Sequence, residues 1–182
     1  MARNTLSRSL HDVGLAAWFG GTLANAVSLN AAAAQADGAH ASGAVANTGW
    51  DRWTPVNAAA IGLHLVGSVG QLAGNQDRIA AQEGVGSMVL AKTALTAAAL
   101  GATAYSRVLG RRVSRQTAVP VESGTEPGAA TPQPVAAAQR QLSMLQWAIP
   151  ALTGALIVIS SFAGEQQRAG EVHKGLVGRL IH

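Results

Sequence analysis

The chain has no cysteine, little charge and few large aromatic residues, and each shortage argues against certain kinds of site or protein class. Without cysteine there is no disulfide, thiolate metal site or thiol nucleophile. Charged residues make up 12% of the 182 positions, about half the usual share in a soluble domain. Only two Phe and one Tyr accompany the abundant Ala, Leu and Val. This combination favours a helical membrane bundle over the alternative, an Ala-rich soluble helical protein.

Catalytic motifs are missing as well. The chain contains no nucleophile elbow, phosphate-binding loop, HExxH sequence or paired acids at membrane level. The net charge is +4, but the arginines are dispersed and do not alternate with aromatic residues. We therefore expect neither an enzyme nor a nucleic-acid-binding protein.

The most informative stretch is an uncharged run of 23 residues, Thr54–Gln76. At about 1.5 Å per residue, a helix of this length covers a hydrocarbon core of about 30 Å. Polar residues recur on one face of that helix, and Gly67, Gly70 and Gly74 place small residues on or beside it. The polar positions are Asn57, His64, Ser68, Gln71 and Asn75. Because lipid disfavours such a face, we expect it to pack against neighbouring helices.

Three other segments have the length and low charge of membrane spans, namely residues 13–36, 84–106 and 141–164. Together with residues 54–76 they predict an all-α integral membrane four-helix bundle, with residues 1–182 forming a single domain. Small and polar residues in the first and last of these spans are also expected to pack between helices. These are Gly20, Gly21, Gln146 and Thr153.

The connections differ in character. Residues 37–53 are rich in Gly, Asn, Asp and Ser and are predicted to form a loop, whose Trp50 and Trp53 either anchor at the membrane interface or pack within the loop. Pro55 is expected in the first turn of the following helix. Residues 107–140 hold four of the six prolines and are predicted to be a flexible, largely unstructured linker, in which a short helix from Val135 can lead into the last span.

The two ends of the chain leave alternatives open. A basic leader, an apolar middle and an Ala-Gln-Ala end allow residues 1–36 to be a cleaved signal peptide instead of a retained first span. Residues 165–182 predict an amphipathic tail on the membrane surface. With four spans, basic residues divide six against six between the two sides, so the positive-inside rule does not orient the chain.

His64 is the principal candidate for chemistry, because ionisable groups at mid-membrane depth are costly and often functional. Its functional interpretations are a haem ligand, a metal ligand or a proton relay, with His11 as the candidate companion. The alternative is a neutral histidine hydrogen-bonded to a facing helix. Lys92, in the third span, either pairs with an interior or lipid group or extends to the membrane boundary.

Residues 10–21, LHDVGLAAWFGG, resemble the opening helix of copper-resistance D-like membrane proteins and related small four-helix families. The matching positions are His11, Trp18, Gly20 and Gly21. The resemblance covers about a dozen residues, and it implies a multi-helix inner-membrane protein with a metal or redox association. The chain departs from copper handling in having no Cys and no Met cluster in its spans.

The sequence as a whole predicts a non-catalytic multi-pass protein of the bacterial inner membrane. Its expected role is that of an accessory or scaffold subunit that contacts the lipid bilayer and other membrane subunits, or self-associates, in a respiratory or transport complex. It needs no cofactor for that role. The alternatives are a redox module that holds haem or a metal at His64, and a small transporter.

Overall fold

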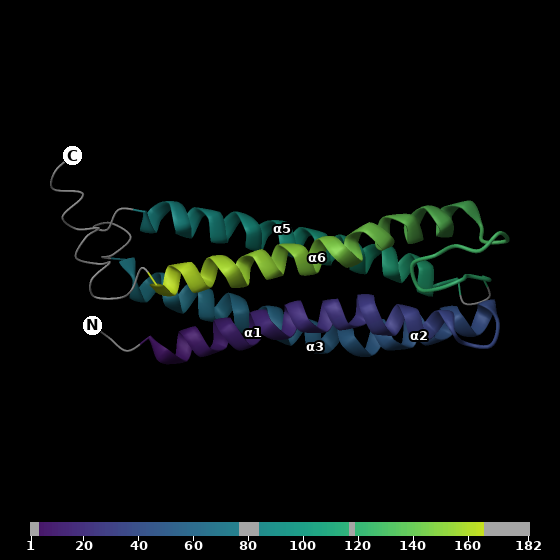
Figure 1. The fold of residues 1–182 in the computed structure, drawn as a ribbon, viewed down its shortest axis with the longest axis horizontal. Coiled ribbons are helices and arrows are strands. Elements are labelled where there is room, and N and C mark those ends of the chain that lie inside the picture. Colours follow the sequence, from purple (N-terminus) through teal and green to yellow (C-terminus); the bar gives the residue numbers. More distant parts are fainter. Residues whose placement is uncertain (1–3, 77–83, 117–118, 166–182) are drawn as a thin grey trace.

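The computed structural model describes residues 4–76, 84–116 and 119–165. Its named elements are all helical: α1 (Thr5–Ala24), the π-helical turn η1 (Asn25–Leu29), α2 (Asn30–Ala34), α3 (Ala39–Gly74), α5 (Val85–Ser114) and α6 (Gln133–Glu165). The first three follow one another directly and α3 returns beside them, while α5 and α6 form a second antiparallel pair (Figure 1). The all-α bundle expected from the sequence is thereby confirmed.

Three helical stretches are long and apolar enough to cross a membrane, judged by length and composition: His40–Gly74, Val85–Ser114 and Gln133–Gly164. They correspond to the second, third and fourth predicted spans. The first predicted span, residues 13–36, is not among them. That part of the chain is divided among α1, η1, α2 and a following turn, and α1 also includes the polar residues before Val13.

The loop predicted over residues 37–53 is wrong, because α3 begins at Ala39 and continues through this segment. The chain reverses before it, where Gly38 adopts a φ of +100° that glycine tolerates readily. The helix is held by its neighbours: the indole N–H of Trp50 donates to Asn30 Oδ1 over 3.1 Å. Tertiary contacts of this kind override a loop-like composition.

Pro55 therefore lies inside α3 and not in its first turn, which corrects a second expectation. The hydroxyl of the preceding Thr54 donates to the Trp50 carbonyl over 2.8 Å. The other aromatic residue of this segment, Trp53, has its ring against Gly21 of α1, where a Cβ would overlap it. Trp50 thus contacts α2 and Trp53 contacts α1, and both lie within α3 instead of a loop.

The linker predicted over residues 107–140 is also largely structured. Helix α5 continues to Ser114, and α6 already begins at Gln133. Their extended ends are stabilised by a shared apolar cluster made of Leu109, Val113, Val135 and Ala138. Burial of these four side chains explains why both helices run beyond their predicted bounds.

Between these helix ends, residues 119–131 form a compact turn at one end of the bundle. The Glu122 N–H donates to the Glu126 carbonyl over 3.0 Å, and the Gln139 side chain donates to the Ser123 carbonyl over 3.1 Å. Gly124 packs so closely on Ala46 that a Cβ would lie 2.8 Å from the Ala46 methyl. Close packing and local hydrogen bonds therefore order a segment whose composition predicts disorder.

Of the tail predicted over residues 165–182, Glu165 is the last residue of α6, and residues 166–182 lie outside the described residues.

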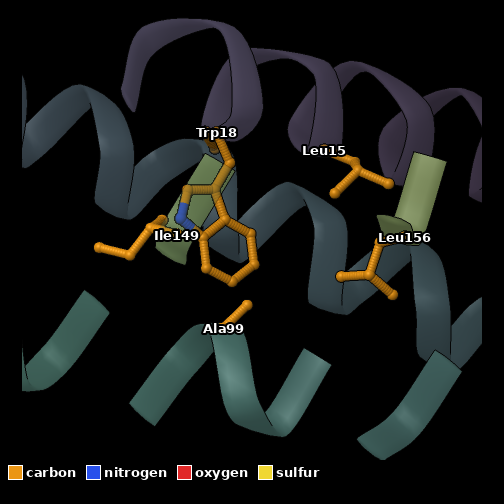
Figure 2. Close-up of a cluster of buried hydrophobic side chains, with 6 residues drawn as sticks. Leu15, Trp18, Ala99, Ile149 and Leu156 are labelled. Carbon is orange, nitrogen blue, oxygen red and sulfur yellow. The ribbon is translucent and has the colours of Figure 1, made fainter. Parts of the chain in front are cut away.

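The main core joins the two helix pairs. Figure 2 shows Leu15 and Trp18 of α1 facing Ala99 of α5 and Ile149 and Leu156 of α6. Trp18 and Leu156 are fully buried, and the Trp18 indole donates to Thr103 Oγ1 of α5 over 3.3 Å. α1 thus contacts both α3 and the α5–α6 pair, and α3 also meets α5 directly, where Asp51 pairs with Arg107 over 2.9 Å.

Candidate functional site

A close crossing of α1 and α3 builds the candidate site. A Cβ on Gly67 of α3 would overlap the backbone of Ser7 and His11, and a Cβ on Gly14 of α1 would overlap the backbone of Ala60 and His64. Each helix therefore offers a glycine where the other helix's backbone passes. Small residues of this kind permit close helix approach, and here they bring His11 and His64 side by side.

The two histidines form a buried pair. Their ring centroids lie 4.5 Å apart with an interplanar angle of 46°. His11 is 1% exposed and His64 is 0% exposed, and the Trp18 ring stands edge-on to His64 at 6.0 Å. His11 lies just before the first predicted span, yet the structure places it against His64, so the two candidate residues of the sequence form one site.

Asp12 orients one member of the pair. Its Oδ1 lies 2.7 Å from Nδ1 of His11. When a neutral His11 donates Nδ1–H to this carboxylate, its Nε2 is left as a hydrogen-bond acceptor. Among the described residues, neither His11 Nε2 nor either ring nitrogen of His64 has a hydrogen-bond partner. Buried polar atoms without partners are uncommon and call for a ligand, a water or a functional role.

A cavity of about 410 Å³ adjoins His11 and lies between α1, α3, α5 and the end of α6. We call it the polar cavity because charged side chains line it, although most of its lining surface is apolar. Its charged and polar lining residues are Arg8, His11, Asp12, Gln71, Lys92, Ser160 and Ser161. Gln71 Nε2 and Ser160 Oγ are buried and have no partner in the described part of the chain. The cavity therefore brings two cations and one carboxylate together with neutral hydrogen-bonding groups.

The pair does not have the spacing for two opposite axial ligands of one haem. With metal–nitrogen distances of about 2 Å, two imidazoles on opposite sides of a metal place their ring centroids about 6 Å apart, whereas these centroids are 4.5 Å apart. Within the described ranges, no group of three or more His, Cys, Asp or Glu residues is placed to hold a metal ion. What the arrangement can do is bind a polar group by hydrogen bonds and charge.

Most of the predicted packing positions lie at helix contacts. Gly70 meets Ser7 of α1 and Gly74 meets Asn4, the residue before α1, as expected for the small-residue face of α3. In α6, Thr153 is fully buried, and Gln146 Oε1 accepts from Asn30 Nδ2 over 2.6 Å. The small and polar faces thus serve as contacts between the helices.

The remaining predicted packing positions differ in their exposure and in their hydrogen-bond partners. Ser68 donates to the His64 carbonyl of its own helix over 2.7 Å. Asn57 is 9% exposed, and its Oδ1 has no partner among the described side chains and backbone. Gly20 is exposed, and a Cβ added to it would meet nothing within 4 Å. Gly20 is therefore not at a contact between the described helices.

A junction around Asn30 was not foreseen from the sequence. Asn30 is 6% exposed and bridges Trp50 of α3 and Gln146 of α6 through its side-chain amide. Gly14 was also missed, although it lies three residues from His11 on the same helix. The signal for Gly14 was its spacing, because residues three apart on a helix share a face.

A lateral opening between α3 and α5 adds two further hollows. One of about 290 Å³ is lined by Trp53 and Asn57 of α3 and by Arg107 of α5. The other, of about 400 Å³, lies toward the opposite end of the same two helices and is mostly apolar. It shares Lys92 and Gln71 with the polar cavity, so the polar and apolar spaces adjoin.

No family model, curated protein or solved structure matches the chain.

Proposed function

We propose that the protein is a non-catalytic multi-pass membrane subunit that packs beside a larger membrane protein through the outer face of α5. We place it in a bacterial inner membrane, in a respiratory or transport assembly. Support comes from three helices with the length and composition of membrane spans and from the exposed apolar side chains that they carry. The observation that carries the proposal is the arrangement of large and small exposed side chains along α5.

The outer face of α5 is a stripe of six exposed residues at helical spacing. They are Leu90, Ala94, Ala98, Gly101, Tyr105 and Val108. At 100° per residue they fall within a sector of about 80°. None of them lines the hollows between α5 and α3.

The middle of this outer face is a shallow depression, because only small residues lie there. Leu90 is 70% exposed, Tyr105 48% and Val108 47%, and these large side chains flank Ala94, Ala98 and Gly101. A Cβ added to Gly101 would meet nothing within 4 Å. In a bilayer, a depression lined by small residues lets a second helix approach closely and gain van der Waals contact. We therefore assign this face to a partner helix.

The test is to fill this depression of α5 with a larger side chain. Gly101→Leu should leave the bundle folded, because the added side chain meets no part of it, and should abolish co-purification of a stoichiometric membrane partner. Gly62→Leu on α3 is the matched control, since a Cβ there also meets nothing within 4 Å. Retention of the partner by Gly101→Leu, or equal loss in both variants, refutes the assignment.

Two measurements separate the competing functions. A second copy as the occupant gives a dimer in mild detergent that Gly101→Leu converts to a monomer, with no other protein attached. A redox module built on His64 gives a visible absorbance band that disappears in His64→Ala. The subunit proposal predicts a colourless protein, so such a band would replace it.

A further inference from the structure

We propose that the hollow of about 290 Å³ between α3, α5 and α6 binds the ring of a neutral, lipid-soluble carbonyl compound of the quinone class. We call this hollow the indole cavity, because Trp50 and Trp53 both line it. It shares no lining residue with the polar cavity beside His11. The site is also separate from the outer face of α5, so the proposal does not depend on the subunit assignment.

The lining of the indole cavity suits a flat ring. Trp50 and Trp53 lie three residues apart, so their indoles share one face of α3. Aromatic rings pack favourably on one another in offset or edge-to-face arrangements. Small-molecule sites are typically apolar hollows of about 300–1,000 Å³ with a few polar groups. The apolar part of the lining comes from three helices and includes Ile61, Leu100, Leu142 and Ile149.

The charge of the indole cavity is balanced within the protein. Arg107 is the only charged residue among its described lining residues, and Arg107 Nη2 lies 2.9 Å from Oδ1 of Asp51. A neutral ligand preserves this balance. A carboxylate or phosphate ligand would instead compete with Asp51 for the guanidinium. The charge of the site therefore favours an uncharged molecule.

A chain of hydrogen bonds determines which end of the Gln146 amide is free. The indole N–H of Trp50 can only donate, so the oxygen of Asn30 faces it, over 3.1 Å. The amide nitrogen of Asn30 then faces Gln146, whose Oε1 accepts from it over 2.6 Å. The amide nitrogen of Gln146 has no partner in the described part of the chain and, unlike Gln71 Nε2, it is not fully buried. Gln146 thus offers the cavity an accessible donor, to which a ring carbonyl is a matching acceptor.

The opening of the indole cavity leads toward lipid. Ala58 of α3 and Ala104 of α5 are exposed residues that also line the cavity, so they lie where it opens between the two helices. Both helices contain stretches long and apolar enough to cross a membrane. When they cross one, a lipid-soluble ligand enters from the bilayer and leaves its apolar tail there. A water-soluble ligand has no such route.

The experiment is a ligand titration of the delipidated full chain in detergent, read by native mass spectrometry. The probe is a benzoquinone with a ten-carbon tail. Three comparison compounds have chains of the same length. An alkylbenzene lacks the carbonyls, a fatty acid carries a charge, and a diacylglycerol has ester carbonyls but no ring. We expect one quinone to bind per chain and each comparison compound to bind at least about tenfold more weakly, the worth of about one hydrogen bond or more.

Two substitutions with matched controls test the location of the site. Gln146→Met removes the donor and should weaken quinone binding roughly fivefold to tenfold, as expected for one hydrogen bond. Gln141→Met, on the same helix but outside the cavity lining, should bind normally. Ala58→Trp fills the opening and should abolish binding. Ala59→Trp, at the adjacent exposed position that does not line the cavity, is its control and should bind normally.

Four results would overturn the quinone site. Equal binding of the alkylbenzene would show that the carbonyls are not recognised. Tighter binding of the fatty acid would show a site for an anion, and tighter binding of the diacylglycerol would show a site for an ester lipid. Unchanged quinone binding in both Gln146→Met and Ala58→Trp would place the ligand elsewhere.

Thermal unfolding of each variant without ligand identifies any that fails to fold. Gln146→Met also breaks the contact with Asn30 and is therefore the variant at risk. Ala58→Trp adds its side chain at an exposed position, so it still tests the cavity if Gln146→Met does not fold.

Discussion

Adding one carbon at Gly14 should destabilise the bundle, because the α1–α3 crossing leaves no room for it. A Cβ built on Gly14 lies 2.4 Å from the backbone nitrogen of His64 and 2.5 Å from the carbonyl oxygen of Ala60, whereas ordinary contact begins at 3.4 Å. Both atoms belong to the backbone and cannot rotate away. Gly14→Ala must therefore move the two helices apart by about 1.0 Å, the difference between 3.4 and 2.4 Å.

The expected cost follows from two opposing effects. Overpacking of a well-filled contact costs about 1–3 kcal/mol. Alanine favours a helix over glycine by about 0.5–1 kcal/mol, which offsets part of that cost. The net loss is on the order of 1 kcal/mol, and for a chain of this length it lowers Tm by roughly 2–4 °C.

The control is the same substitution at an open position of the same helix. Gly20 is exposed, and a Cβ there meets nothing within 4 Å, so Gly20→Ala keeps the helix-propensity gain without the overlap. We expect Gly20→Ala to leave Tm unchanged or to raise it slightly. The assay is thermal unfolding of both variants in one detergent, followed by circular dichroism. Equal Tm values for the two variants would refute the close crossing.

Two further substitutions test the core and the junction around Asn30. Leu156→Ala, at a residue that is 0% exposed, should cost about 2–5 kcal/mol of unfolding free energy. Val158→Ala, at a residue of the same helix that is 55% exposed, should cost far less, and similar losses for the two variants in denaturant titrations would place Leu156 outside the core. Asn30→Ala removes the shared partner of Trp50 and Gln146, so it should lower Tm and increase amide exchange near both residues. Unchanged exchange would contradict the bridging role of Asn30.

The sequence identified many residues of the candidate site, but it did not predict that His11 and His64 lie against each other. The polar and glycine face of residues 54–76 predicted that Gly67, Gly70 and Gly74 lie at a helix contact, because helical periodicity is a local property. That the contacting helix carries His11 at the level of His64 depends on the register between α1 and α3. Register is set by long-range packing, which includes the unforeseen Gly14.

The wrong predictions have a common cause. Residues 37–53 and the linker over residues 107–140 were judged by composition, which measures the preference of a segment in isolation. In the structure, Trp50 bonds to Asn30, and Leu109 packs in a cluster with Val135 from the next helix. These partners are distant in sequence, and their contacts outweigh the weak local preference of Gly, Asn and Pro-rich segments.

Composition and a period of 3.6 residues are enough to predict the all-α class, the low charge of the long helices and the small-residue face of α3. The start of α3 at Ala39 and the buried contact between His11 and His64 become apparent in the folded bundle. The same is true of the polar cavity and the apolar groove that meet at Lys92. These features depend on the distance and register between helices, which are set by side-chain contacts among residues far apart in the chain.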